Sequence, residues 1–207
     1  MSTLLLRLAA PMQSWGLNSK FTRRQTEREP TKSAVIGLLA CALGRKRTES
    51  VNDLNSLKYG VRTDQAGELL TDYQIAKREE KDNPFVSYRQ YLSDAIFLAG
   101  IEGEESFLRE LEAAVRSPVY PLFLGRRSCP PTLPIVLGIR TLSLLEALKT
   151  EPYLGKVKTE RPPEQLPIML DDEAGWIMHR DLPVSFSQEH RRYTFRSAEV
   201  TYVSFPD

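Results

Sequence analysis

The sequence has few of the residues from which most catalytic and metal sites are built, with two cysteines and two histidines among 207 residues. Cys41 and Cys129 form no Cys-x-x-Cys motif and have no histidine nearby in the sequence. This argues against a structural zinc site or a disulfide framework and fits a reducing cytosol. We therefore expect both cysteines to be small core or loop residues.

The chain also lacks a long hydrophobic run. Its longest uncharged apolar stretch, SAVIGLLACALG at residues 33–44, falls well short of the ~20 residues that span a bilayer. The N-terminal MSTLLLRLAAP carries Arg7 inside its apolar run and is too short for a secretory signal, so it predicts a first strand instead. We expect a soluble, cytoplasmic protein with no membrane partner.

The sequence motifs of nucleotide-binding and hydrolytic enzymes are absent too. There is no Walker A loop, no dinucleotide fingerprint and no Gly-x-Ser-x-Gly elbow. The acidic run LDDE at residues 170–173 is interpreted as a solvated turn, because its consecutive carboxylates point in different directions. No set of His, Asp and Glu has the spacing of metal ligands. We expect no catalytic residue, no metal and no cofactor.

The net charge of +1 conceals a segregation of charge along the chain. Residues 1–47 hold nine Lys and Arg against two Glu, residues 48–118 hold eight against fourteen acidic residues, and residues 119–207 hold eleven of each sign. Because a polyanion responds to local potential rather than to total charge, this arrangement predicts a basic face suited to phosphates. The alternative is a solvated N-terminal loop.

Hydrophobic periodicity and turn residues predict the order of the elements. A strand at residues 2–11 is followed by a long polar loop, a helix at 31–44 and a short helix at 51–58. A strand at 59–64 and a segment at 67–76 are expected to form a hairpin around Ala66 and Gly67. One long strand at 86–101, a helix at 104–116, a strand at 134–140 and a helix at 142–150 complete the series.

This βαββαβ order predicts an α+β protein with a ferredoxin-like palm, the fold of RNA-recognition modules, over residues 1–140. The charge-dense KREEKDNPF at residues 77–85 is expected to be the tip of a projecting ribbon, so that an inserted β-hairpin thumb lies at about residues 76–90. Residues 141–207 are expected to add a helix and a small antiparallel β extension, with strands in 175–186 and 193–205. They could form a second small sheet or pack on the first domain.

Four segments, PMQSWG, PTKSAVIGLLACALG, YLSDAIF and LGRRSCPP, occur in an order and spacing that resembles the CasD family over roughly residues 3–140. These proteins are CRISPR-associated subunits of the Cascade surveillance complex, within the repeat-associated RNA-binding superfamily. The resemblance implies a non-catalytic subunit with a ferredoxin-like palm and a β-hairpin thumb, which caps the 5′ end of CRISPR RNA by holding its repeat-derived handle. It also implies docking to the backbone and large subunits, and contact with target DNA only through the complex.

The loop that contains LGRRSCPP has residues suited to RNA. A glycine allows close approach to a ligand backbone, and guanidinium groups bind phosphates and stack on unpaired bases. The start of the first helix can add free N–H groups and a cation for a phosphate, or be an ordinary cap. Trp15 can stack a base or be a core anchor. The expected RNA-binding residues are Gln13, Trp15, Gly16, Arg23, Arg24, Arg28, Lys32, Ser33, Gly125, Arg126, Arg127 and Ser128, with Arg89 and Tyr91 added from the resemblance.

An enzymatic alternative remains open at this point. A related subtype cuts the CRISPR precursor without a metal, through a site of tyrosine, lysine and histidine, and such cleavage needs a general base and a general acid. Here His179 or His190 would have to meet Tyr73 and Lys77, which makes a metal-independent repeat endoribonuclease the second hypothesis. A general single-strand RNA-binding module outside CRISPR systems is the third.

Overall fold

The structure is a computed structural model that describes residues 1–17, 22–77, 83–156 and 163–204. Most of it is one sheet of seven strands, in the order β10-β11-β9-β4-β7-β1-β8. Every neighbouring pair in this sheet is antiparallel. The strands are β1 (Ser2–Ala9), β4 (Lys58–Gln65), β7 (Ile96–Gly103), β8 (Val136–Arg140), β9 (Gln165–Asp171), β10 (Ile177–Ser185) and β11 (Arg192–Ser204).

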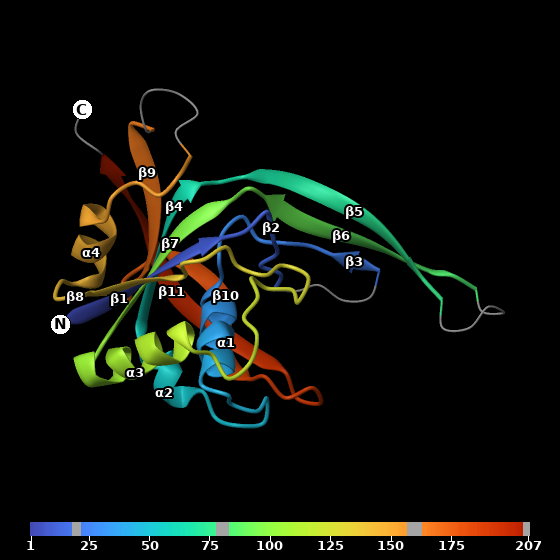
Figure 1. The fold of residues 1–207 in the computed structure, drawn as a ribbon, viewed down its shortest axis with the longest axis horizontal. Helices are drawn as coiled ribbons and strands as arrows, with labels where there is room; N and C mark the ends of the chain where they lie inside the picture. Colours follow the sequence, from blue (N-terminus) through green and yellow to red (C-terminus); the bar gives the residue numbers. More distant parts are fainter. Residues whose placement is uncertain (18–21, 78–82, 157–162, 205–207) are drawn as a thin grey trace.

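Helices cover both faces of this sheet (Figure 1). The helices α1 (Lys32–Ala42) and α3 (Glu105–Arg116) pack on one face, and α4 (Leu144–Thr150) packs on the other. The alternation of β1 explains the two cores, because Leu4, Leu6 and Leu8 face α1 and α3 whereas Leu5 faces α4. A short helix, α2 (Asn52–Asn55), precedes β4. The helices at 31–44 and 104–116 are confirmed, with Thr31 as the N-cap of α1.

A second sheet is formed by β2 (Met12–Gln13), β3 (Arg23–Arg24), β5 (Glu68–Ala76) and β6 (Phe85–Ser93). Strand β6 lies at its centre. It pairs along its whole length with β5, and on its other edge with β2 and, in parallel, with β3. The polar loop after β1 is therefore paired with β6 through the two short strands, β2 and β3, that it contains.

The predicted hairpin around Ala66 and Gly67 is wrong, because β4 and β5 do not pair. Both edges of β4 are occupied by β7 and β9. The chain instead turns away at Gly67, whose φ is 69° and whose Cβ position would lie 2.4 Å from the carbonyl oxygen of Ser93. Strand β5 is thus directed out of the large sheet and pairs with β6.

The predicted long strand at 86–101 is also wrong, because it is two strands in two sheets. The break is at Asp94, which has a positive φ of 54°. Strand β6 ends before it and β7 begins after it. The β5–β6 ribbon therefore leaves the large sheet and projects from it (Figure 1). The predicted tip at 77–85 lies largely outside the described residues, since 78–82 are not described.

The C-terminal extension continues the large sheet rather than forming a second one, because β9 pairs with β4. The two predicted strands correspond to β10 and β11, which pair with each other. The interpretation of LDDE as a solvated turn is wrong for Asp171. Its carboxylate is largely buried and pairs with Lys32 at 2.6 Å and with Arg196 at 2.7 Å. None of the helices in the described ranges is long and apolar enough to cross a bilayer.

Four buried charges join the extension to the first helix. Arg196 on β11 bridges Asp171 and Asp181, and the backbone N–H of Lys32 donates to Asp181 at 2.7 Å. The side chain of Asp181 is 1% exposed, so its charge depends on these partners.

Replacing Asp181 with Ala should lower the free energy of unfolding by about 3–5 kcal/mol, because it leaves the buried Arg196 with one partner fewer and the first N–H of α1 unpaired. Urea denaturation measures this. The control Glu173→Ala removes an exposed carboxylate near the end of β9 and should change stability by less than about 0.5 kcal/mol. Equal stability of the two variants would show that the cluster does not hold the extension.

Glu29, beside this cluster, predicts a pH dependence. Burial raises the pKa of Glu29 to about 7, although Arg196 lowers it. The folded protein therefore favours the neutral carboxyl, and this contribution to stability is complete below the unfolded pKa of about 4.5 and is lost as the pH rises towards 7. Glu29→Gln should gain stability relative to the wild type between pH 5 and pH 8 in urea titrations. A difference that stays constant over this range would contradict the burial of a charge at Glu29.

Candidate nucleic-acid interface

Three segments that are far apart in the sequence meet at the base of the ribbon. Ser14, after β1, donates its backbone N–H to the carbonyl of Leu124 at 3.2 Å. Its hydroxyl donates to the carbonyl of Gln90 on β6 at 3.1 Å. The polar loop, β6 and the loop at residues 121–135 are thus bonded together, and most of the residues predicted to bind RNA lie on them.

Gly125 has a structural role that the sequence did not predict. Its φ is 83°, and a Cβ built there would lie 1.6 Å from the carbonyl oxygen of Ser14. In this structure the close approach that requires glycine is to the protein's own backbone. Gly125 seats the loop against the turn that contains Ser14.

The two arginines that follow differ from each other. The guanidinium of Arg126 lies 4.5 Å from the centre of the Tyr91 ring, and its Nη2 donates to the carbonyl of Arg24 at 2.9 Å. Its Nη1 is buried and has no hydrogen-bond partner among the described residues. Arg126 therefore holds the loop to β6 and β3, and it covers Tyr91, which is 4% exposed. By contrast Arg127 and Ser128 are exposed.

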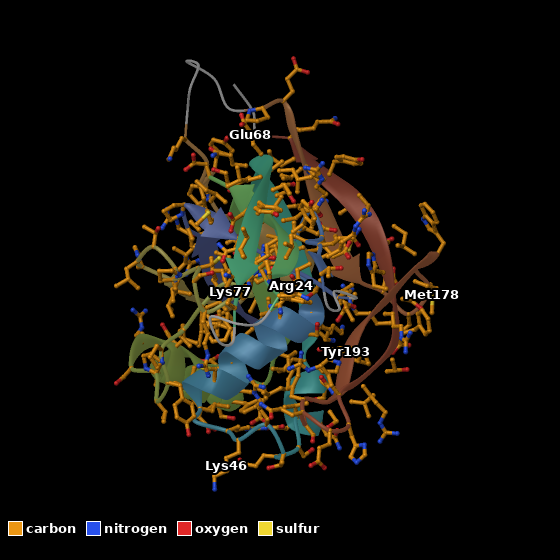
Figure 2. The ribbon with its side chains drawn as sticks, turned by 90° about the vertical axis from the view of Figure 1, so that its right-hand side faces the viewer. Arg24, Lys46, Glu68, Lys77, Met178 and Tyr193 are labelled. Carbon is orange, nitrogen blue, oxygen red and sulfur yellow. The ribbon has the colours of Figure 1, made fainter. Side chains whose placement is uncertain are left out.

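Exposed cations surround this junction. Arg23 and Arg24 form the short strand β3, which places Arg23 beside Tyr88 and Arg24 beside Arg89. Both are exposed, as is Arg28. Figure 2, which views the molecule from the ribbon side, shows Arg24 near the middle of this face. Arg89 is half-buried and donates to the hydroxyl of Ser87 at 3.3 Å.

A hollow of about 280 Å³ lies among these residues, between β3, β5 and β6. Its lining residues are Arg23, Arg24, Gln25, Thr71, Tyr88 and Gln90. Sequence reasoning singled out the two arginines but missed Gln25, Thr71, Tyr88 and Gln90. The alternation in FVSYRQYL, which places Tyr88 and Gln90 on the face opposite Arg89 and Tyr91, was a signal that could have found two of them.

Five of the residues predicted to contact RNA are buried in the structure, namely Gln13, Trp15, Lys32, Ser33 and Tyr91. Gln13 donates to the carbonyls of Leu8 and Ala95, and the indole N–H of Trp15 donates to Gln13 at 3.2 Å. Trp15 is 1% exposed, so it is a core anchor and does not offer a face to a base. Gly16, which follows it, is exposed.

The start of α1 is not an open phosphate site either. The ammonium of Lys32 bonds to Asp171 and to the carbonyl of Leu57, and the side chain is 6% exposed. Ser33 is buried and lies within hydrogen-bonding distance of Thr31. Since Asp181 already accepts from the Lys32 backbone N–H, a carboxylate of the protein takes the place that was predicted for a phosphate.

The residues of the enzymatic alternative are not brought together. His179 lies on β10, where burial and the charge of Arg196 lower its pKa. His190 is exposed between β10 and β11, whereas Tyr73 lies on β5 of the ribbon. In Figure 2, Lys77 on the ribbon and Met178 on β10 are well separated. Among the described residues there is also no group of three or more His, Cys, Asp or Glu that could hold a metal ion.

Comparisons with known proteins each cover most of the chain. The family model described as CRISPR-associated protein (Cas_Cas5) matches residues 3–199. The CRISPR system Cascade subunit CasD of Escherichia coli (strain K12) is 36% identical, with 77% of this chain and 81% of that protein covered. A solved structure described as "Crystal structure of Cas protein" has a TM-score of 0.80 and 42% identity, covering 98% of this chain and 95% of that one. A chain of a "CRISPR RNA-guided surveillance complex" has a TM-score of 0.85 and 29% identity, covering 99% of this chain and 91% of that one.

Replacing Gly125 with Ala should destabilise the junction, because a methyl group at a positive φ would meet the carbonyl of Ser14. We expect a loss of about 1–3 kcal/mol in urea denaturation and faster hydrogen exchange in residues 12–17 and 121–130. The control Arg127→Ala, two positions along and exposed, should leave both measurements within about 0.5 kcal/mol of the wild type. Unchanged hydrogen exchange in Gly125→Ala would mean that the position of the loop does not depend on the close contact between Gly125 and Ser14.

Proposed function

This chain belongs to the CRISPR-associated Cas5 family, and from that membership we propose that it is a non-catalytic subunit of an RNA-guided surveillance complex that holds the 5′ repeat-derived handle of CRISPR RNA. Two relatives, a Cascade subunit and a chain of a CRISPR RNA-guided surveillance complex, support membership in such a complex. Both are similar to this chain over most of its length.

The observation that carries the proposal is the presence of exposed arginines on two loops that are bonded to each other beside the ribbon. Arg23, Arg24 and Arg28 come from the polar loop and Arg127 from the loop at 121–135, almost a hundred residues away. Hydrogen bonds from Ser14 and the Arg126 guanidinium join the two loops. Exposed arginines on loops held in fixed positions are suited to a single-stranded RNA backbone, which they neutralise without reading its sequence.

The ferredoxin-like palm is a further part of the proposal. The order β4-β7-β1-β8, with α1 after β1 and α3 after β7, is consistent with a palm over residues 1–140. The β5–β6 ribbon, inserted between β4 and β7, then corresponds to the thumb. Residues 141–207 correspond to the extension that lengthens the palm sheet.

The ribbon and the remaining surface are proposed to bind the backbone and large subunits, with target DNA contacted only through the complex. The ribbon exposes several large apolar side chains, and exposed apolar patches are typical of interaction surfaces. Outside the hollow beside β3, its exposed apolar residues include Leu69, Leu70 and Ile75. We infer no catalytic residue, since neither histidine lies with Tyr73 and Lys77.

The test incubates the full chain with labelled CRISPR-repeat RNA and with the handle oligonucleotide, in EDTA and at two salt concentrations. We expect the intact handle to be retained and affinity to fall with salt, because phosphate contacts release counterions. Replacing Arg23 or Arg127 with Ala should weaken binding about 3- to 10-fold. The slope of log affinity against log salt concentration should fall by about the value for one phosphate contact.

The matched control is Arg109→Ala on α3, an exposed arginine of another face, which should bind like the wild type. Equal loss for Arg109→Ala and Arg127→Ala would remove the ribbon base from the mechanism. Metal-independent cutting of the repeat RNA at one position, abolished by His179→Ala or His190→Ala, would instead identify a processing enzyme.

A further inference from the structure

The hollow between β3, β5 and β6 combines three kinds of side chain that a nucleotide needs. One is an aromatic ring, another is uncharged hydrogen-bonding groups and the third is guanidinium groups, with no carboxylate among the six lining residues. Its volume of about 280 Å³ lies just below the range of about 300–1,000 Å³ that is typical for drug-sized ligands. A site of this size suits one base rather than a folded RNA element.

Tyr88 gives the hollow a fixed aromatic surface. The side chain is 47% exposed, and its ring meets the ring of Tyr73 edge to face, with centres 5.4 Å apart and planes at 68°. Because Tyr73 lies directly opposite Tyr88 across the β5–β6 pair, this contact holds the exposed ring in place. Such a ring is a stacking platform for an unpaired base.

Gln90 and Thr71 lie beside this ring. They face each other across the same pair of strands, two residues from Tyr88 and Tyr73, and so share their face of the ribbon. Neither the amide of Gln90 nor the hydroxyl of Thr71 has a hydrogen-bond partner in the described parts of the chain. Both side chains can therefore donate to and accept from the edge of a base.

Arg23 and Arg24 supply the positive charge. Neither guanidinium is ion-paired within the described ranges, so both are available to a phosphate. Their backbone is fixed, because β3 pairs with Tyr88 and Arg89 and the carbonyl of Arg24 accepts from Arg126. The cations are thus held at the rim of the same hollow as the aromatic ring.

We propose that this hollow is a subsite for one unpaired nucleobase of the bound RNA, which stacks on Tyr88 and bonds through its edge to Gln90 and Thr71, with the adjacent phosphate on Arg23 or Arg24. The subsite deepens the proposed function and rests on it, since the RNA handle supplies the base. Because the base is held through its edge, the handle is bound in one register and not only by its charge.

The experiment measures the affinity of the full chain for handle RNAs in which one base at a time is replaced by an abasic site, in EDTA. For the wild type, we expect one position at which base removal weakens binding at least about fivefold, because a stacking contact is lost. Tyr88→Ala should bind the intact handle at least about fivefold more weakly and should show no further loss at that position. Tyr88→Phe, which keeps the ring, should behave like the wild type. Phe85→Ala, on the opposite face of β6, is the matched control.

The outcomes separate this subsite from the function on which it rests. If the chain does not retain handle RNA at all, the proposed function fails. If the handle is retained but Tyr88→Ala loses the same factor at every abasic position, or loses nothing, the subsite is overturned while the proposed function stands. If Tyr88→Ala leaves RNA affinity unchanged and prevents assembly with a neighbouring subunit, the hollow is a protein-binding surface and the subsite is likewise overturned.

Discussion

The close approach of Gly125 to the carbonyl of Ser14 fixes the positions of the three segments that form the interface. Only a residue without a Cβ can bring the loop at 121–135 so near to the turn after β1. Once the loop is seated, Arg126 reaches the Tyr91 ring and the carbonyl of Arg24, and it is this contact that fixes β3 against the loop. The exposed arginines on both sides then keep constant positions, which lowers the entropy that RNA binding must overcome.

A second constraint decides where the ribbon points. Strand β4 has a partner on each edge, so the chain that follows it must leave the sheet, and Gly67 and Asp94 are the positions where it leaves and returns. Each has a positive φ. Because the two turns lie close together, with Gln65 donating to the carbonyl of Asp94, the ribbon projects from a narrow base. The loop that carries Arg23 and Arg24 pairs with β6 above that base, so the ribbon and the arginines are held as one unit.

Local signals in the sequence were sufficient to predict most of the helices and strands and the segments that form the interface. The cap of α1, the apolar face of α3 and the glycine and proline clusters predicted helices and loops at the observed positions. They could not predict the pairing of β5 with β6, since the occupied edges of β4 depend on β9, about a hundred residues away. For the same reason Lys32 was misassigned, because its partner Asp171 lies 139 residues further along the chain. Sequence places Lys32 in a basic segment, whereas folding places it in a buried ion pair.

The burial of Lys32 changes how the charge of the N-terminal segment is understood. The excess of nine basic over two acidic residues in 1–47 includes Lys32, whose charge is neutralised inside the protein by Asp171. The attraction for a polyanion therefore comes from fewer groups, and Arg23, Arg24 and Arg28 matter because they are exposed beside the ribbon. Salt screens the attraction between exposed arginines and RNA. Arginines at the rim of a hollow that contains an aromatic ring also favour an RNA whose base fits that hollow. An RNA end that fits the hollow thus gains affinity that other single strands, attracted by the same arginines, do not.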